Sequence, residues 1–210
     1  MGIDDIFGAV IEMEEERVAA LVAGELAAGT AVPEILDDGL IAALDEVGDL
    51  FSAGEMFVPE MLMAAQAAKA GLEVLRPHLT DAAAAPLGVV VMGTVQGDLH
   101  DIGKNLVGMM LEGGRFRFVD IGVDVPPARF VEAARDEGAD IVAMSALLTT
   151  TMPAMRATAA ALRESGFEGG IMIGGAPVSL AFADEIGATA FAEDAPGAVR
   201  EARRLIGRNR

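Results

Sequence analysis

A short loop holds the residues best suited to chemistry. His100 stands two positions after Asp98, within the glycine-containing stretch 93–104 (GTVQGDLHDIGK). An imidazole on a loop can bind a metal or exchange a proton, and a neighbouring carboxylate can accept its second ring N–H, which fixes the tautomer. Considered alone, the pair also fits an ordinary surface or helix-capping histidine. The loop is therefore a candidate metal or proton-transfer site, and the rest of the sequence must distinguish these interpretations.

The composition restricts the kind of metal site. The chain has 210 residues, no cysteine and two histidines, the second being His78. A zinc or iron site needs three or four protein ligands, which here would have to include several carboxylates. One imidazole is sufficient when a macrocycle supplies the equatorial ligands, so a haem-like or corrin-like cofactor fits better. The sequence contains no P-loop, no G-x-G-x-x-G dinucleotide loop and no nucleophile elbow of a Ser-His-Asp triad.

The elements that precede this loop have a helical pattern. One run of apolar residues has the spacing that puts side chains on a single face of a helix: Leu40, Ile41, Leu44, Val47 and Phe51. Pro33 fits the first turn of that helix, and Gly54 falls just beyond its end. We expect a first long helix over 6–27 and a third over 59–75. Residues 1–79 are therefore predicted to form a helical bundle, followed by a linker over 80–87.

From residue 88 onward, short apolar runs alternate with helical stretches. The predicted strands are 88–92, 116–121, 141–145, 171–173 and 188–191, and the predicted helices are 103–112, 127–137, 153–165, 178–186 and 197–206. This alternation predicts an α/β domain over 88–210, with a five-stranded parallel sheet of the flavodoxin or Rossmann type and helices on both faces. Ligands bind such sheets beyond the carboxyl ends of the strands, so the site is sought in loops 94–102, 146–152 and 174–177.

The charge and hydropathy of the chain argue against several partners. The net charge of −18 repels phosphate backbones, so we expect no nucleic-acid partner. The apolar runs are too short to cross a bilayer, and the N-terminus lacks the basic region of a secretory signal. We therefore expect a cytoplasmic protein with no membrane partner.

Three ordered motifs resemble those of corrinoid proteins. The segment Asp98-x-His100-x-x-Gly103 resembles the cobalamin-binding motif of corrinoid methyltransferase proteins and of cobalamin-dependent methionine synthase. Residues 145–151 (SALLTTT) resemble that family's S-x-L-x-T-x-S/T segment, and 174–176 (GGA) resemble its Gly-Gly loop. The α/β part of the chain is therefore similar to a corrinoid methyl carrier.

The resemblance extends to the helical part. Residues 48–51 (GDLF) and 57–60 (FVPE) look like the cap domain of the same family. By this resemblance Phe57, Met61 and Met63 could shield the upper face of the cobalt, and Met61 is predicted to bind the cofactor. A Met-rich helix face also fits ordinary core packing. The resemblance thus covers nearly the whole chain.

The resemblance assigns roles to individual residues. His100 would be the lower axial ligand of cobalt, Asp98 would accept its second ring N–H, and Thr151 would hydrogen-bond Asp98. Many relatives have serine at the position of Thr151, and threonine offers the same hydroxyl. These three form the predicted catalytic relay, which would couple protonation of the imidazole to its ligation. The other predicted cofactor-binding residues are Gly97, Leu99, Asp101, Ile102, Gly103, Ser145, Leu147, Thr149, Gly174 and Gly175.

The resemblance also implies a function and partners. Such a chain would hold cobalamin or a related corrinoid and accept a methyl group on its cobalt from a substrate-specific methyltransferase. A second methyltransferase would pass the group to a thiol or tetrahydrofolate, and a reductive activation protein would serve the cobalt. The chain would not be catalytic without partners. Two other interpretations stay open: the cobalamin-binding subunit of a mutase, and a cobalamin sensor or storage protein.

Overall fold

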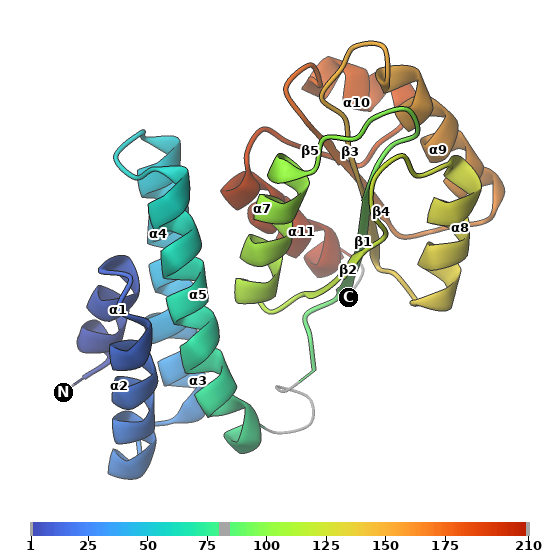
Figure 1. Cartoon of the computed structure of the whole chain (residues 1–210). Helices are drawn as coiled ribbons and strands as arrows, with labels where there is room; N and C mark the ends of the chain where they lie inside the picture. The colour runs from blue at the N-terminus through green and yellow to red at the C-terminus, as the bar shows by residue number, and fades with distance from the viewer. Residues whose placement is uncertain (1, 80–84, 209–210) are drawn as a thin grey trace. The chain divides into compact units, whose positions relative to one another are not determined.

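The fold is that of a computed structural model, which describes residues 2–79 and 85–208. The contacts divide into an N-terminal helical unit and a C-terminal α/β unit (Figure 1). Of the predicted linker, residues 80–84 lie outside the described residues. Among the described residues, no helix has both the length and the apolar character needed to cross a membrane.

The helical unit differs from the predicted helices at two places. Its elements are α1 (Ile3–Ile11), α2 (Glu15–Ala28), α3 (Val32–Glu34), the π-helix η1 (Ile35–Ile41), α4 (Ala42–Ser52), α5 (Val58–Leu75) and the 3-10 helix η2 (Arg76–His78). The prediction of one helix over 6–27 is wrong. The chain breaks at Met13, whose φ of +62° is left-handed and incompatible with a continuing α-helix. The predicted second helix is continuous but contains the seven-residue π segment.

Close helix approach explains the packing of this unit. A Cβ on Gly71 of α5 would come within 2.8 Å of Leu40 in η1 and 2.9 Å of Val18 in α2, so only glycine allows these helices to meet here. The start of α5 is capped, because the Phe57 N–H donates to Glu60 Oε2 at 2.7 Å. Pro59 fits the first turn, where no N–H donor is needed.

The α/β unit contains one five-stranded parallel sheet in the order β2-β1-β3-β4-β5. The strands are β1 (Val89–Thr94), β2 (Arg117–Asp120), β3 (Ile141–Ser145), β4 (Gly170–Gly174) and β5 (Ala190–Ala192). The helices between and after them are α7 (Ile102–Gly113), α8 (Pro127–Asp136), α9 (Met152–Glu164), α10 (Leu180–Ile186) and α11 (Ala195–Arg208). This is the flavodoxin-like order, and the predicted fold class is confirmed.

Helices cover both faces of this sheet. Figure 1 shows α7 and α11 on one face and α8 and α9 on the other. One buried cluster joins α8, α9 and α10 to β3 and β4, through side chains such as Phe130, Met155, Phe182, Met144 and Ile173. Because both faces are covered, the sheet offers its carboxyl edge to ligands.

The register aligns the strand ends at that edge. Thr94 of β1 lies opposite Ser145 of β3, Ser145 lies opposite Gly174 of β4, and Gly174 lies opposite Ala192 of β5. The chain order reverses between β1 and β3, so the loops after these two strands diverge and leave room for a ligand.

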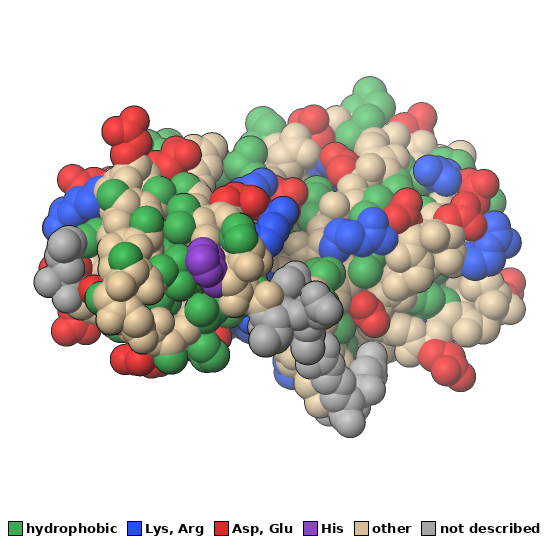
Figure 2. Space-filling view, turned by 90° about the horizontal axis from the view of Figure 1, so that it is seen from below, with side chains coloured by type: hydrophobic (Ala, Val, Ile, Leu, Met, Phe, Trp, Pro, Cys, Tyr) green, Lys and Arg blue, Asp and Glu red, His purple; other side chains and the backbone are tan. Residues whose placement is uncertain are grey.

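The surface is acidic over both units. On the face drawn in Figure 2, carboxylates are scattered among fewer Lys and Arg side chains, without a continuous basic patch. This distribution agrees with the net charge of −18. The visible face therefore repels rather than attracts polyanions.

Candidate functional site

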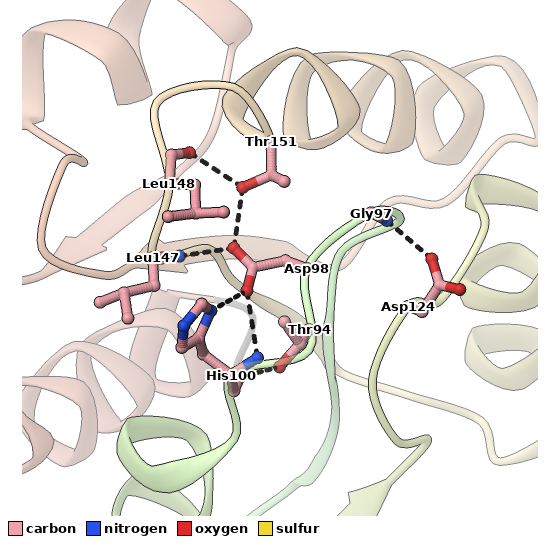
Figure 3. A network of polar contacts seen from close by, with 8 residues as sticks. All are labelled: Thr94, Gly97, Asp98, His100, Asp124, Leu147, Leu148 and Thr151. Atoms are coloured by element: carbon pink, nitrogen blue, oxygen red, sulfur yellow. Dashed lines mark hydrogen bonds and ion pairs between the residues drawn. The ribbon is translucent and has the colours of Figure 1, made fainter.

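The loop after β1 buries a carboxylate among four hydrogen-bond donors (Figure 3). Asp98 is fully buried. Its Oδ1 accepts from the His100 backbone N–H at 3.1 Å and lies 2.6 Å from His100 Nδ1. Its Oδ2 accepts from the Leu147 N–H and from the Thr151 hydroxyl, both at 2.8 Å. One side chain thus ties the loop after β1 to the loop after β3.

These contacts determine the charge of Asp98. Burial by itself raises the pKa of this carboxyl, but the hydrogen bonds from His100, Leu147 and Thr151 outweigh burial and hold the pKa well below its ordinary value. Asp98 is therefore ionised at neutral pH. A carboxylate only accepts hydrogen bonds, so the ring nitrogen that faces it, Nδ1 of His100, must carry a proton.

The imidazole of His100 offers its second nitrogen outward. The side chain is 52% exposed, while its carboxylate partner is fully buried. A neutral ring that donates through Nδ1 has its lone pair on Nε2. The described residues contain no group of three or more metal-ligating side chains. The ring therefore suits a metal whose other ligands come from a cofactor.

Exposed apolar side chains stand in the loops after β1 and β3 and at the start of α7, close to His100 or its hydrogen-bond partners in the sequence. Leu99 is 71% exposed and Ile102 is 77% exposed, while Leu147 and Leu148 after β3 are 44% and 43% exposed. Gly103 has open space where a Cβ would stand. Large exposed apolar side chains at the carboxyl ends of parallel strands are typical of a ligand-binding surface. These loops thus offer an apolar surface to a ligand.

Thr151 lies at the far end of the polar network, immediately before α9. Its hydroxyl is 2.8 Å from Asp98 Oδ2 and 2.8 Å from Leu148 O. A hydroxyl has a single hydrogen, so it donates to one of these acceptors at a time. Thr151, Asp98 and His100 are thus in one chain of contacts, although their catalytic roles stay predictions.

The glycine pair leaves no space for side chains. A Cβ on Gly174 would stand 2.9 Å from Ala192 O. Gly175 has φ +128°, and a Cβ there would stand 1.9 Å from Ala146 O. Ser145 and Gly174 are neighbours in the sheet, whereas Thr149 is exposed in the loop after β3. The structure brings Ser145 and the glycine pair to the same edge as His100, and their cofactor contacts stay predictions.

The predicted cap residues belong to the helical unit. Met61 is fully buried in α5, while Phe57 and Met63 are exposed. Met61 thus packs as a core residue of its own unit. Its contact with a cofactor stays a prediction.

Sequence reasoning missed two residues that hold the His100 loop. Thr94, the last residue of β1, donates through Oγ1 to the His100 carbonyl at 2.8 Å. Asp124, in the loop after β2, accepts from the Gly97 N–H at 2.7 Å. The site predicted from the sequence did not include the loop after β2. A signal was available there, because the carboxyl end of every parallel strand opens on the same edge.

Sequence reasoning also missed the buried cation Lys104. Lys104 in the first turns of α7 is almost fully buried, and its Nζ lies 2.5 Å from Asp120 Oδ2 and 2.9 Å from Asn105 Oδ1. Asp120 ends β2, so this pair fixes the start of α7 against the sheet. Removing either partner would leave a charge with poor compensation.

The sequence matches two models described as "B12 binding domain", one over residues 88–203 and one over residues 3–76. It is 44% identical to dimethylamine corrinoid protein 1 of Methanosarcina acetivorans, with 97% of each chain covered.

Two solved structures are similar over nearly the whole chain. A cobalamin-binding protein from Desulfitobacterium hafniense superimposes with a TM-score of 0.85 at 29% identity, with 98% of both chains covered. A chain of the methanol:cobalamin methyltransferase complex from Methanosarcina barkeri gives 0.81 at 31% identity, with 98% of this chain and 79% of that chain covered.

Proposed function

This chain belongs to the B12-binding corrinoid proteins of methyltransferase systems, and from that premise we propose that it carries a methyl group on the cobalt of a corrinoid bound through His100. It binds cobalamin or a related corrinoid and works with a methyltransferase partner. The observation that supports the role of His100 is a half-exposed imidazole fixed through Nδ1 by a buried carboxylate.

The residues present fit such a cofactor. His100 would hold the cobalt through Nε2, while Asp98 would keep the proton on Nδ1 and Thr151 would support Asp98. Leu99 and Ile102 would lie against the apolar part of the corrin, which they would shelter from water. When bound, the cobalt supplies the centre that accepts and releases the methyl group. Orientation, shelter and a fixed imidazole are then what the chain contributes.

The glycine pair would leave room for an extended cofactor tail. Ser145 and Thr149 would offer hydroxyls where the tail enters the carboxyl edge, and Gly174 and Gly175 would leave the backbone free of side chains along it. Gly97 would allow the backbone turn before Asp98, since its φ is +86°. By the same reasoning Asp101, directly before α7, and Gly103, in its first turn, would lie beside the corrin.

The proposal includes the division of the chain. Residues 1–79 would be the cap domain, 80–87 the linker and 88–210 the corrinoid-binding domain, which limited proteolysis between residues 80 and 87 would test. Met61 would contact the corrin from the cap. A cytoplasmic location is also part of the proposal.

The first experiment compares His100→Ala with the wild type. Each purified full-length protein is mixed with hydroxocobalamin, freed of unbound cofactor, and examined by visible spectroscopy. We expect stoichiometric retention by the wild type, with a spectral change that His100→Ala loses completely. His78→Ala is the matched control, because His78 is the other histidine and lies exposed in η2. It should behave as the wild type.

Other outcomes would change the assignment. Binding with identical spectra in wild type and His100→Ala would remove His100 from the metal and favour storage or sensing. An absence of binding in every variant would contradict the proposed function as a whole.

We also propose two further partners, a second methyltransferase and a reductive activation protein. The second enzyme would transfer the methyl group to a thiol or to tetrahydrofolate. The assay contains corrinoid-loaded wild type, its substrate-specific methyltransferase, a methyl donor and a reductant. We expect a methylated thiol or methyltetrahydrofolate to form only when the second enzyme is added. His100→Ala is the control. No methylated acceptor with either class of enzyme would reject this part of the proposal.

A further inference from the structure

His100 is fixed through its backbone as well as its ring. Its N–H donates to Asp98 Oδ1 at 3.1 Å, and its carbonyl accepts from Thr94 Oγ1 at 2.8 Å. The first contact belongs to the Asp98 network that also fixes the ring. The second is independent of it, because Thr94 lies outside the Asp98-x-His100 motif and on the strand rather than in the loop.

The sheet holds Thr94 rigidly. Thr94 is fully buried and ends β1, which lies between β2 and β3 in the sheet. Its N–H donates to Gly122 O at 3.0 Å, and its carbonyl accepts from the Val125 N–H at 3.0 Å. It also lies opposite Ser145 of β3. Because Thr94 is held in this way, its hydrogen bond fixes the peptide group of His100 relative to the sheet.

Asp124 holds the other bend of the same loop. Its Oδ1 accepts from the Gly97 N–H at 2.7 Å, and its own N–H donates to Asp98 O at 2.9 Å. Asp124 has φ +53° and Gly97 has φ +86°, so two left-handed residues meet in this reciprocal contact. Aspartate and asparagine tolerate this conformation better than other side chains that have a Cβ. Figure 3 shows Asp124 and Thr151 on different sides of Asp98.

We propose that Thr94 and Asp124 are positioning residues for His100, and that they set both corrinoid affinity and the share of bound corrinoid ligated by the imidazole. The proposal rests on the proposed role of His100 as the cobalt ligand. Asp98 fixes the rotation of the ring, while Thr94 and Asp124 fix the backbone from which the ring projects. When a metal-binding side chain stands on a loop, the affinity for the metal is lower if the loop must become ordered during binding. The contacts of Thr94 and Asp124 order this loop beforehand and so lower the entropic cost of ligation.

A purely structural role makes a different prediction. If the Thr94 hydroxyl only satisfied the His100 carbonyl, its loss would lower stability and leave ligation unchanged. Thr158 of α9 provides the comparison, because it is also fully buried and its Oγ1 donates to the Ala154 carbonyl at 2.8 Å. Thr158→Val thus removes the same kind of hydrogen bond at a position away from the loop.

The experiment uses full-length wild type, Thr94→Val, Thr94→Ser and Thr158→Val with hydroxocobalamin as the probe. Equilibrium affinity and the visible signature of imidazole ligation are measured for each. We expect Thr94→Val to bind about 5- to 30-fold more weakly and to lose part of the signature, as for a buried hydrogen bond. Thr94→Ser retains the hydroxyl and should lie within about twofold of the wild type. Thr158→Val should match the wild type in affinity and spectrum.

A second pair of variants decides the matter if Thr94→Val does not fold. Asp124 is exposed, so its substitution leaves the core intact. Asp124→Ala should weaken binding by about three- to fivefold, while Asp124→Asn retains an acceptor oxygen and should restore it.

The two failures are distinguishable. A wild type without the imidazole signature would reject the role of His100 and this inference with it. A wild type with the signature, together with Thr94→Val or Asp124→Ala variants that bind and absorb identically to it, would overturn the inference alone. An equal loss of affinity in Thr158→Val would do the same.

Discussion

Replacing Asp98 with asparagine is expected to lower the free energy of unfolding of the α/β unit by about 2–4 kcal/mol at neutral pH. The carboxylate is fully buried and accepts from two backbone N–H groups, a ring nitrogen and a hydroxyl. An amide has one acceptor oxygen, and its NH₂ group would face donors such as the Leu147 N–H. Buried donors would then be left without acceptors, which costs more than the loss of an exposed hydrogen bond.

The destabilisation should shrink in acid. The pKa of Asp98 lies below its ordinary value in the folded protein, so the ionised carboxylate adds stability that is fully present above the unfolded-state pKa of about 4. That stability is lost as pH falls from there towards the folded-state pKa. Asparagine does not titrate in this range. The stability difference between wild type and Asp98→Asn should therefore narrow below pH 4.

Amide hydrogen exchange of the cofactor-free full-length protein measures this difference. The chain has no tryptophan or tyrosine for optical probes, whereas the buried amides of β1 and β3 report the stability of the α/β unit. Asp140→Asn is the control, because Asp140 Oδ2 accepts from the Val89 N–H at 2.8 Å in the same unit. A loss in Asp98→Asn no larger than in Asp140→Asn, or independent of pH, would contradict the interpretation of the network.

Replacing Gly175 with alanine should lower the free energy of unfolding of the α/β unit by about 3 kcal/mol or more. The backbone φ of +128° is strained for any residue with a Cβ, at a cost of about 1–3 kcal/mol. The added Cβ would also stand 1.9 Å from Ala146 O and 2.9 Å from Ala146 C. These are backbone atoms of a buried residue, so the loops after β3 and β4 must separate.

That separation would reach the candidate site. Ala146 precedes Leu147, whose N–H donates to Asp98 Oδ2. Gly175→Ala should therefore weaken retention of hydroxocobalamin as well as lower the thermal unfolding temperature.

Gly166→Ala separates strain from collision. Gly166 follows α9 with φ +82° and open space where a Cβ would stand, so alanine there should cost about 1–2 kcal/mol. Two quantities are compared for these variants: thermal unfolding, measured by calorimetry, and the retention of corrinoid. Equal destabilisation by both would show that contact with Ala146 does not govern this position.

Most of the fold could be predicted because it depends on local patterns. Alternating apolar runs and helical stretches identified five strands, and the right-handedness of parallel crossovers left few arrangements for them. The break at Met13 was not predictable from apolar periodicity, because the residues on both sides continue a helical pattern. The π segment Ile35–Ile41 escaped for the same reason, since its extra residue per turn leaves the apolar pattern readable as an α-helix.

Composition and motifs alone indicated the kind of cofactor that suits this chain. With no cysteine and one histidine beside an aspartate, a cofactor with its own equatorial ligands suits His100 better than a zinc or iron site does, and the ordered motifs pointed to the family. The tertiary structure decided which residues hold that histidine in place. Thr151 is 53 positions from Asp98, Leu147 is 49 away, and Asp124 is 27 from Gly97. Contacts at such separations depend on strand register and on the ends of parallel strands meeting at one edge, which no local periodicity encodes.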